Sequence, residues 1–279
     1  MALSTFYIGS YTQFLSPEIV GSGDGISTVQ LNEETGQLSV LQTKRTISPS
    51  YLAISGDNKY LYCNTEVLEE ENPVVQAYKI KEDNTLEFMN EQPIKGGCPC
   101  HLYVMDNRVL VACYVSGNML EYPLGKSGKL MECTKNHQHS GSSVNLERQE
   151  APHAHHVAIH PINNDVYVCD LGIDMVKAYE VVKGKLGPNL NKDVVIVRGS
   201  GPRHLVFDHD GRIGYVINEL TGTVAVLKNK AGIFEQIGSY ESLPESYANT
   251  PSASAIRIHP NGEFLYVANR KFDAITIFR

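Results

Sequence analysis

The chain has 279 residues, of which 42% are apolar and 20% charged, and its formal net charge is −7. This composition is ordinary for a folded protein with a sizeable core. The negative balance argues against general nucleic-acid binding, because polyphosphates bind basic surfaces. No apolar run approaches the roughly 18 residues of a membrane-spanning helix, and the opening MALSTFYIGS lacks the basic start and apolar core of a secretory signal. We expect a cytoplasmic protein without nucleic-acid or membrane partners.

The chain contains six cysteines: Cys63, Cys98, Cys100, Cys113, Cys133 and Cys169. Three of them, Cys63, Cys113 and Cys169, lie inside apolar runs that resemble strands, where a thiol packs as a small hydrophobic group. Cys98 and Cys100 do not have the Cys-x-x-Cys spacing of redox or zinc pairs, and no second pair complements them. The set is more typical of a reducing compartment than of a disulfide framework.

Five similar segments recur along the chain, each with an apolar strand, a polar turn and a second apolar strand. They are YLAISGDNKYLYCNTE from 51, HLYVMDNRVLVACYV from 101, HVAIHPINNDVYVCDL from 156, HLVFDHDGRIGYVINEL from 204 and AIRIHPNGEFLYVANR from 255. Their second strands, anchored at Tyr62, Val111, Tyr167, Tyr215 and Tyr266, are 49, 56, 48 and 51 residues apart. TFYIGSYT, near the start, matches the second strand alone.

Two further strands follow each pair, as in MVKAYEVV from 175 and TVAVLKN from 223. Four short antiparallel strands in a repeat of about 50 residues are typical of a β-propeller blade. We therefore predict an all-β fold, a single propeller domain over residues 1–279. The first repeat lacks its first strand, and the last stops after its third strand, AITIFR. We expect about six blades and a chain that is short at its C-terminal end.

Seven polar residues occupy special places in the last three repeats. They lie at the start of a first strand or the end of a second strand: His153, His155, Asp170, Arg203, His204, Glu219 and Arg270. In an antiparallel meander these two places share one edge of the sheet. Because blades repeat around a central channel, we expect these side chains to meet at one mouth of it.

The segment EAPHAHHVAIH places four histidines between residues 150 and 160. Alternation along a strand predicts that His153 and His155 share a face and that His156 points the other way. We expect His156 and His160 to be structural. Zinc binding would have His153 and His155 as ligands and Asp170 as a possible third. The arginines expected at the same mouth would repel a dication, so we predict no metal.

Three segments resemble the lactonase family of seven-bladed propellers: QHSGSSVNLERQEAPHAHHVAIHP, GPRHLVFDHDGRIGYVINEL and PSASAIRIHPNGEFLYVANR. That family includes propeller-type 6-phosphogluconolactonases and 3-carboxy-cis,cis-muconate lactonizing enzymes. The resemblance runs along essentially the whole chain, from YIGSYT to the end. It implies an active site made of the histidine of the proline–histidine loop, the arginine of GPRH, the glutamate of NEL and the arginine of NR. These match His155 or His153, Arg203, Glu219 and Arg270.

These residue types suit acid–base work on an anionic substrate. Arginine forms paired hydrogen bonds with phosphate or carboxylate, so we expect Arg203 and Arg270 to hold the anion and to offset charge on the lactone oxygen. A histidine can take a proton from water, and Glu219 could orient that histidine or act as the base itself. His204 lies beside Arg203. Arg148, in the loop before the histidines, either covers the site or is simply an exposed loop arginine.

The predicted function is hydrolysis of 6-phospho-D-glucono-1,5-lactone to 6-phosphogluconate, a step of the pentose phosphate pathway, without a cofactor. The expected partner is therefore a small anionic lactone. A carboxymuconate-lactonizing type of enzyme is an alternative, because paired arginines suit carboxylate as well as phosphate. A non-catalytic propeller that binds a partner or a sugar phosphate is a second alternative. No Gly-x-Ser-x-Gly segment supports a serine hydrolase.

Overall fold

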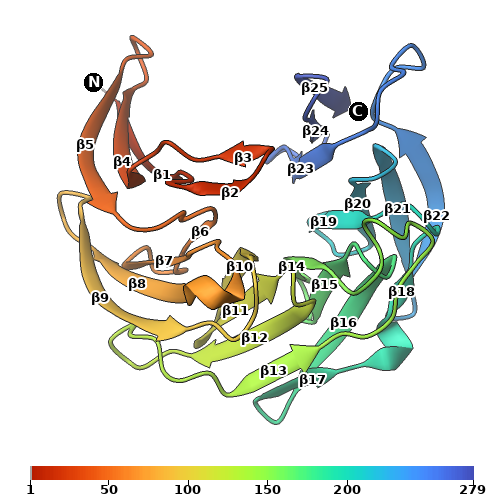
Figure 1. The fold of residues 1–279 in the computed structure, drawn as a ribbon, viewed down its shortest axis with the longest axis horizontal. Coiled ribbons are helices and arrows are strands. Elements are labelled where there is room, and N and C mark those ends of the chain that lie inside the picture. The colour runs from red at the N-terminus through yellow and green to blue at the C-terminus, as the bar shows by residue number, and fades with distance from the viewer. Residues whose placement is uncertain (1) are drawn as a thin grey trace. The chain divides into compact units, whose positions relative to one another are not determined.

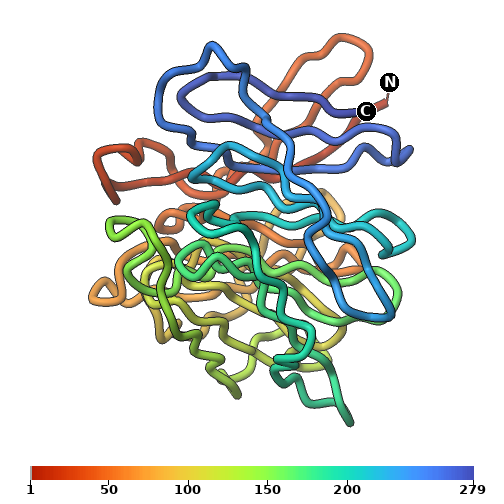
Figure 2. Tube along the Cα trace, turned by 90° about the vertical axis from the view of Figure 1, so that its right-hand side faces the viewer, coloured from red at the N-terminus to blue at the C-terminus, as the bar shows by residue number. Residues whose placement is uncertain are grey.

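The computed structural model describes residues 2–279, and antiparallel sheets joined by turns make up nearly all of this part of the chain (Figures 1 and 2). The helical segments among these residues are two single turns, η1 (Glu69–Glu71) and η2 (Leu190–Lys192). No helix in residues 2–279 is long and apolar enough to cross a membrane. The chain divides into two compact units, Met1–His137 and Gln138–Arg279.

The first unit contains three larger sheets and a hairpin. The first sheet has the order β1 (Leu3–Gly9), β4 (Gly25–Asn32), β5 (Leu38–Arg45). The second has the order β6 (Leu52–Ile54), β7 (Tyr60–Asn64), β8 (Val74–Ile80), β9 (Leu86–Pro93). The third has the order β10 (Pro99–Met105), β11 (Arg108–Cys113), β12 (Asn118–Pro123), β13 (Lys135–Gln138), the last of which ends at the boundary between the units. The hairpin, which the sequence did not predict, pairs β2 (Phe14–Ser16) with β3 (Ile19–Val20).

The second unit contains three sheets. The first has the order β14 (Ala154–Ile159), β15 (Val166–Asp170), β16 (Met175–Val182), β17 (Lys185–Pro188), and the short β18 (Val194–Val195) also pairs with β16. The second has the order β19 (Pro202–Phe207), β20 (Ile213–Asn218), β21 (Thr223–Lys230), β22 (Ile233–Glu241). The third has the order β23 (Ala253–Ile258), β24 (Leu265–Asn269), β25 (Ala274–Phe278).

These sheets confirm the predicted all-β fold and its blades. Four sheets contain the predicted meander of four strands, and the sheets nearest the two ends of the chain have three strands each. YLAIS, HVAIH, HLVFD and AIRIH contribute the first strands β6, β14, β19 and β23, as predicted. The prediction of a single domain over residues 1–279 stays a prediction.

Neighbouring sheets within each unit pack through their apolar faces. In the second unit, the rings of Tyr167 on β15, Phe207 on β19 and Phe234 on β22 lie with centroids 5.3–5.6 Å apart. Cys169, Val176, Leu205 and Val216 belong to the same buried cluster. Fully burying a side chain of this size stabilises a fold by roughly 1.5–3 kcal/mol, so such contacts hold each sheet rigidly against the next.

The cysteines behave as the strand pattern predicts. Cys63, Cys113 and Cys169 are fully buried, and all six cysteines are free thiols. Burial raises the pKa of the Cys169 thiol, which keeps it in the unreactive protonated form.

Candidate active site

One edge of each sheet in the second unit brings together the start of its first strand and the end of its second. The strand register pairs Ala154 with Asp170, Pro202 with Asn218, and Ala253 with Asn269. The main chain continues this pairing beyond the strands, since the Glu219 N–H donates to Gly201 and the Arg270 N–H donates to Ser252. The antiparallel topology therefore gathers the predicted residues at one edge, as the repeat pattern indicates.

A β-bulge occurs at this edge in each of the three sheets. On β14 the register moves from Ala154 opposite Asp170 to His156 opposite Cys169, which leaves His155 as the extra residue. On β19 the same shift leaves Arg203 as the extra residue between Pro202 and His204. A bulged residue escapes the strict alternation of a strand, and bulges commonly re-aim side chains beside functional sites. The two residues most prominent in the predicted chemistry thus both occupy bulges.

Glu219 is the centre of an arginine cluster. Its Oε2 accepts hydrogen bonds from Arg203 Nε at 2.8 Å and from Arg270 at 2.9 Å, and its Oε1 accepts one from Arg148 at 2.7 Å. The Glu219 side chain is 9% exposed and that of Arg203 is 15% exposed, whereas those of Arg148 and Arg270 are 43% and 47% exposed. Three guanidinium groups and one carboxylate leave a formal charge of +2, and two of the cations face solvent.

The charge of Glu219 is strongly stabilised. Burial of the carboxyl by itself raises its pKa, but Arg203, Arg270 and Arg148 together outweigh burial and hold the pKa at about 2. Glu219 is therefore ionised at neutral pH and has little tendency to take up a proton. This favours a role in orienting the arginines over the role of general base.

His204 is linked to Arg203 and lies beside two other histidine rings. The distance from Arg203 Nη1 to His204 Nε2 is 3.0 Å. A guanidinium can only donate, so His204 Nε2 accepts and the ring is a neutral imidazole with its proton on Nδ1. The His204 ring centroid lies 5.4 Å from that of His155 and 4.3 Å from that of His156.

His155 and His156, which are expected to point in opposite directions, both lie beside the ring of His204. The bulge at His155 interrupts the alternation from which that expectation came. Burial is the main cause that lowers the pKa of both imidazoles, and the charge of Arg203 adds to it. The pKa of His156 falls to about 3, and that of His155 lies well below its usual value of 6.5. His155 is thus a neutral imidazole that lies close enough to Arg203 and Glu219 for both charges to affect it.

His153 occupies a different environment. Its Nε2 lies 3.3 Å from Glu150 Oε1, and its main-chain N–H donates to Asp170 Oδ1 at 2.7 Å. The other Asp170 oxygen, Oδ2, lies 2.5 Å from Nδ1 of His139. Hydrogen-bond donors thus occupy both oxygens of Asp170, the possible third ligand of the zinc alternative. Among residues 2–279, no group of three or more His, Cys, Asp or Glu side chains is arranged to hold a metal ion.

The loop before β14 carries Arg148 to the cluster. Asn145 caps a turn by accepting from the main chain of Arg148, and the Gln149 side chain donates to the Leu171 carbonyl at 2.8 Å. Gln149 is fully buried, so it pins the loop to the end of β15. The loop therefore has a defined structure. Arg148 reaches Glu219 from this loop, so its side chain is not simply that of an exposed loop arginine.

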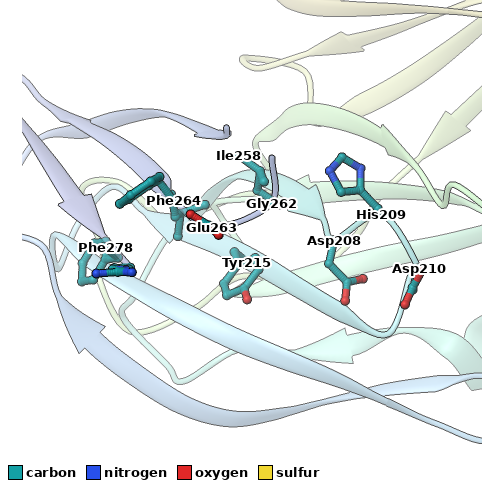
Figure 3. Close-up of a pocket in the computed structure, with 11 residues that line it drawn as sticks. Asp208, His209, Asp210, Tyr215, Ile258, Gly262, Glu263, Phe264 and Phe278 are labelled. Carbon is teal, nitrogen blue, oxygen red and sulfur yellow. The ribbon is translucent and has the colours of Figure 1, made fainter. Parts of the chain in front are cut away.

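A well-defined cavity in this unit lies elsewhere. Its volume is about 430 Å³, and it lies between the β19–β20 turn at Asp208–Asp210, the β23–β24 turn near Glu263, and Phe278 (Figure 3). These turns are at the opposite ends of the strands from the arginine cluster, and none of the predicted site residues lines the cavity. A more open hollow of about 290 Å³ lies beside Arg270. The concentration of positive charge makes the edge with Arg270 the better candidate site.

Sequence reasoning missed the partners that support this edge, namely His139, Gln149 and Tyr179. His139 and Gln149 lie in a loop with no strand pattern, and Tyr179 reads as an ordinary core residue of β16. The only available signal was the richness of the loop in residues that form hydrogen bonds.

Comparison with known proteins agrees with this architecture. A family model described as "Lactonase, 7-bladed beta-propeller" matches residues 5–279. A 6-phosphogluconolactonase of Bacillus subtilis (strain 168) is 34% identical over 278 residues, which are 98% of this chain and 76% of that protein. The crystal structure of a candidate 6-phosphogluconolactonase from Bacteroides fragilis superposes with a TM-score of 0.90 at 30% identity, covering 99% of this chain and 77% of that one. A periplasmic gluconolactonase of Pseudomonas aeruginosa, 23% identical, shares the fold with a TM-score of 0.88, over 100% of this chain and 82% of that one.

Proposed function

The chain belongs to the lactonase family of seven-bladed β-propellers, and we propose that it hydrolyses 6-phospho-D-glucono-1,5-lactone to 6-phosphogluconate. The observation that carries this proposal is the cluster of three arginines around one ionised glutamate, with a neutral histidine beside it. The formal charge of +2 complements a phosphate group, which carries −1.5 to −2 at neutral pH. The names of the relatives from Bacillus subtilis and Bacteroides fragilis point to the same substrate.

The exposed arginines suit the phosphate. Arg270 and Arg148 each present about half of their side chain to solvent and are already oriented by Glu219. An arriving phosphate can accept hydrogen bonds from the guanidinium N–H groups that Glu219 does not occupy. Because these arginines are held in place before binding, little conformational entropy is lost when the anion binds.

The buried His155 and the largely covered Arg203 suit the chemistry at the lactone carbonyl. His155 takes a proton from water while the water oxygen bonds to C1 of the lactone, and the electron pair of the carbonyl moves onto its oxygen. The buried guanidinium of Arg203 stabilises that oxyanion. When the oxyanion collapses, the bond from C1 to the ring oxygen breaks and the imidazolium returns its proton to that oxygen. Glu219 holds Arg203 in place and, being negative, stabilises the transient imidazolium.

The proposal places the activity in a reducing compartment, the cytoplasm. Its support is the set of six free cysteines, of which Cys98 and Cys100 are two residues apart and unbridged. Fractionation of cells with an antibody against the chain tests this part, and recovery with periplasmic markers would refute it.

The experiment that tests the reaction compares three lactones. The purified chain is mixed with freshly generated 6-phosphogluconolactone, with glucono-1,5-lactone, which lacks the phosphate, and with a carboxylated muconolactone, and each rate is compared with spontaneous hydrolysis. We expect acceleration with the phosphorylated lactone and a KM at least about tenfold higher without the phosphate, since a lost charge-assisted contact costs roughly 1.5–3 kcal/mol. Acceleration of the muconolactone alone would move the function to the carboxylated class. No acceleration of any lactone would leave only a binding role.

A further inference from the structure

A buried chain of hydrogen bonds lies directly behind the bulge that carries His155. The Tyr179 hydroxyl lies 2.7 Å from His139 Nε2, and His139 Nδ1 lies 2.5 Å from Asp170 Oδ2. The other oxygen of Asp170 accepts the main-chain N–H groups of His153 at 2.7 Å and Gly172 at 3.0 Å. A carboxylate can only accept, so Nδ1 of His139 carries a proton and donates it to Asp170. The side chains of His139 and Asp170 are 1% and 0% exposed, so water does not compete for these bonds.

These hydrogen bonds fix the position of the main chain just before the bulge. Asp170 holds the N–H of His153, and the next residue, Leu171, donates its own N–H to the His153 carbonyl at 3.0 Å. The turn that follows packs so closely that a Cβ at Gly172 would lie 1.8 Å from the Ala151 carbonyl oxygen. Both polar groups of the His153 main chain are thus fixed, two residues before His155.

The bulged residue depends on such anchors. In the regular ladder the strand register fixes each residue opposite another, but His155 is the extra residue of the bulge, so the register alone does not fix its position. The main chain on either side of it is held: Ala154, which follows the anchored His153, pairs with Asp170, and His156 pairs with Cys169. A change at Asp170 is therefore expected to shift the main chain that carries the His155 imidazole.

The other two sheets of this unit use a different residue at the same place. The end of β20 has Asn218 and the end of β24 has Asn269 where β15 has Asp170. Asn218 donates to Thr223, and Asn269 donates to the Ser242 carbonyl. An amide is therefore compatible with this position in the blade. A carboxylate occurs in the sheet whose bulge carries a histidine and whose neighbouring loop provides His139.

We propose that Asp170, oriented by His139 and Tyr179, is a positioning residue that sets the geometry of the His155 imidazole. This inference rests on the proposed function for its kinetic consequence, but its structural consequence can be measured without any activity. Asparagine has one acceptor and one donor where Asp170 has two acceptors. In the Asp170→Asn variant only one side-chain oxygen remains to accept. It can accept from the His153 N–H or from the His139 Nδ1–H, as Asp170 does, but not from both.

The test combines kinetics with NMR of the histidine rings. We expect Asp170→Asn to lower kcat by about 10–100-fold with KM changed less than about twofold, because a shift of about 1 Å in a reacting group costs on that order. We also expect the ring resonances of His155, assigned by their loss in His155→Gln, to shift. The far-downfield proton expected for the short bond from His139 to Asp170 should disappear. The matched control is Asp165→Asn, which removes a buried carboxylate at the other end of the same strand, where it accepts from Lys192 at 2.6 Å. That variant should leave kcat and the His155 resonances unchanged.

If Asp170→Asn does not fold, a pair of His139 variants tests the same inference. The amide nitrogen of asparagine replaces Nδ1, so His139→Asn should retain most of the activity and the native His155 resonances, whereas His139→Ala should lose both. Unchanged His155 resonances in Asp170→Asn, or in His139→Ala, overturn the inference, whatever happens to kcat. A wild-type chain that is inactive on every lactone overturns the proposed function instead, and the NMR comparison still decides whether Asp170 positions His155.

Discussion

Arg203 Nε donates to Glu219 Oε2 over 2.8 Å and so connects the bulge at the start of β19 to the residue that follows β20. The two residues belong to one sheet, and the strand register alone brings them together. Arg270 reaches the same carboxylate oxygen from the next sheet, and Arg148 reaches the other oxygen from a loop. Glu219 is therefore the residue on which the arrangement of all three cations depends.

Replacing Glu219 with glutamine should destabilise the protein in a pH-dependent way. The pKa of Glu219 is lowered on folding from 4.5 to about 2, so its ionised form contributes stability above about pH 4.5, and this contribution is lost as the pH falls towards 2. We expect Glu219→Gln to lower the free energy of unfolding at pH 7 by on the order of 2–3 kcal/mol. Denaturant titrations at several pH values measure this. The difference between variant and wild type should shrink as the pH approaches 2, and a constant difference would contradict the assignment.

Replacing Arg270 with alanine should weaken substrate binding more than turnover. Its side chain is half exposed, and in the proposed function it binds the anion, so its loss should remove mainly uniform binding and raise KM about tenfold or more with a smaller change in kcat. Steady-state kinetics on 6-phosphogluconolactone measure both constants. Arg212→Ala is the control, because Arg212 is an exposed arginine paired with Asp210 at the opposite ends of the strands. A fall in kcat with an unchanged KM would place Arg270 at the reacting carbonyl instead.

Replacing His155 with alanine should slow turnover. A group that transfers a proton in the transition state typically contributes 10²–10⁴-fold to the rate, so kcat should fall by about that factor with little change in KM. His153→Ala is the comparison, because the His153 ring faces Glu150 rather than the arginine cluster. If His153→Ala loses turnover while His155→Ala keeps it, the base is His153. If neither variant loses turnover, the proton-transfer mechanism is wrong.

The pH profile should reflect the lowered pKa of His155. Only the neutral imidazole can accept a proton, and burial together with Arg203 lowers the pKa of His155 well below 6.5. We therefore expect kcat at saturating lactone to stay flat from about pH 8 down through 6.5 and to fall only at more acidic pH. Initial rates corrected for spontaneous hydrolysis measure the profile. A midpoint near 6.5 would indicate a solvated histidine as the base.

Chelators should leave the activity unchanged. Arg148, Arg203 and Arg270 together with the Glu219 carboxylate leave a formal charge of +2 at this edge, which repels a divalent cation. The check is a rate measurement after dialysis against a chelator, with metal analysis of the same sample. Activity that is lost on dialysis and restored by one added metal would refute the arginine-based mechanism.

The sequence by itself determined the all-β fold, the blade as the repeating element and the edge that gathers the candidate site residues. Apolar alternation and turns with Asp, Asn or Gly recur about every 50 residues, and antiparallel pairing requires the start of a first strand to meet the end of a second. Arg203, His204, Glu219 and Arg270 follow from those two facts, because their places in the repeat are local properties of the chain.

The tertiary structure decided the directions and the partners of these side chains. Bulges at His155 and Arg203 override the period-two alternation, so the faces of consecutive histidines could not be derived from spacing. The low pKa of Glu219 results from three arginines that come from two sheets and a loop, and the buried contact of His139 with Asp170 joins residues 31 positions apart. Burial and charge–charge interactions depend on distances through space, and only the folded chain defines those distances.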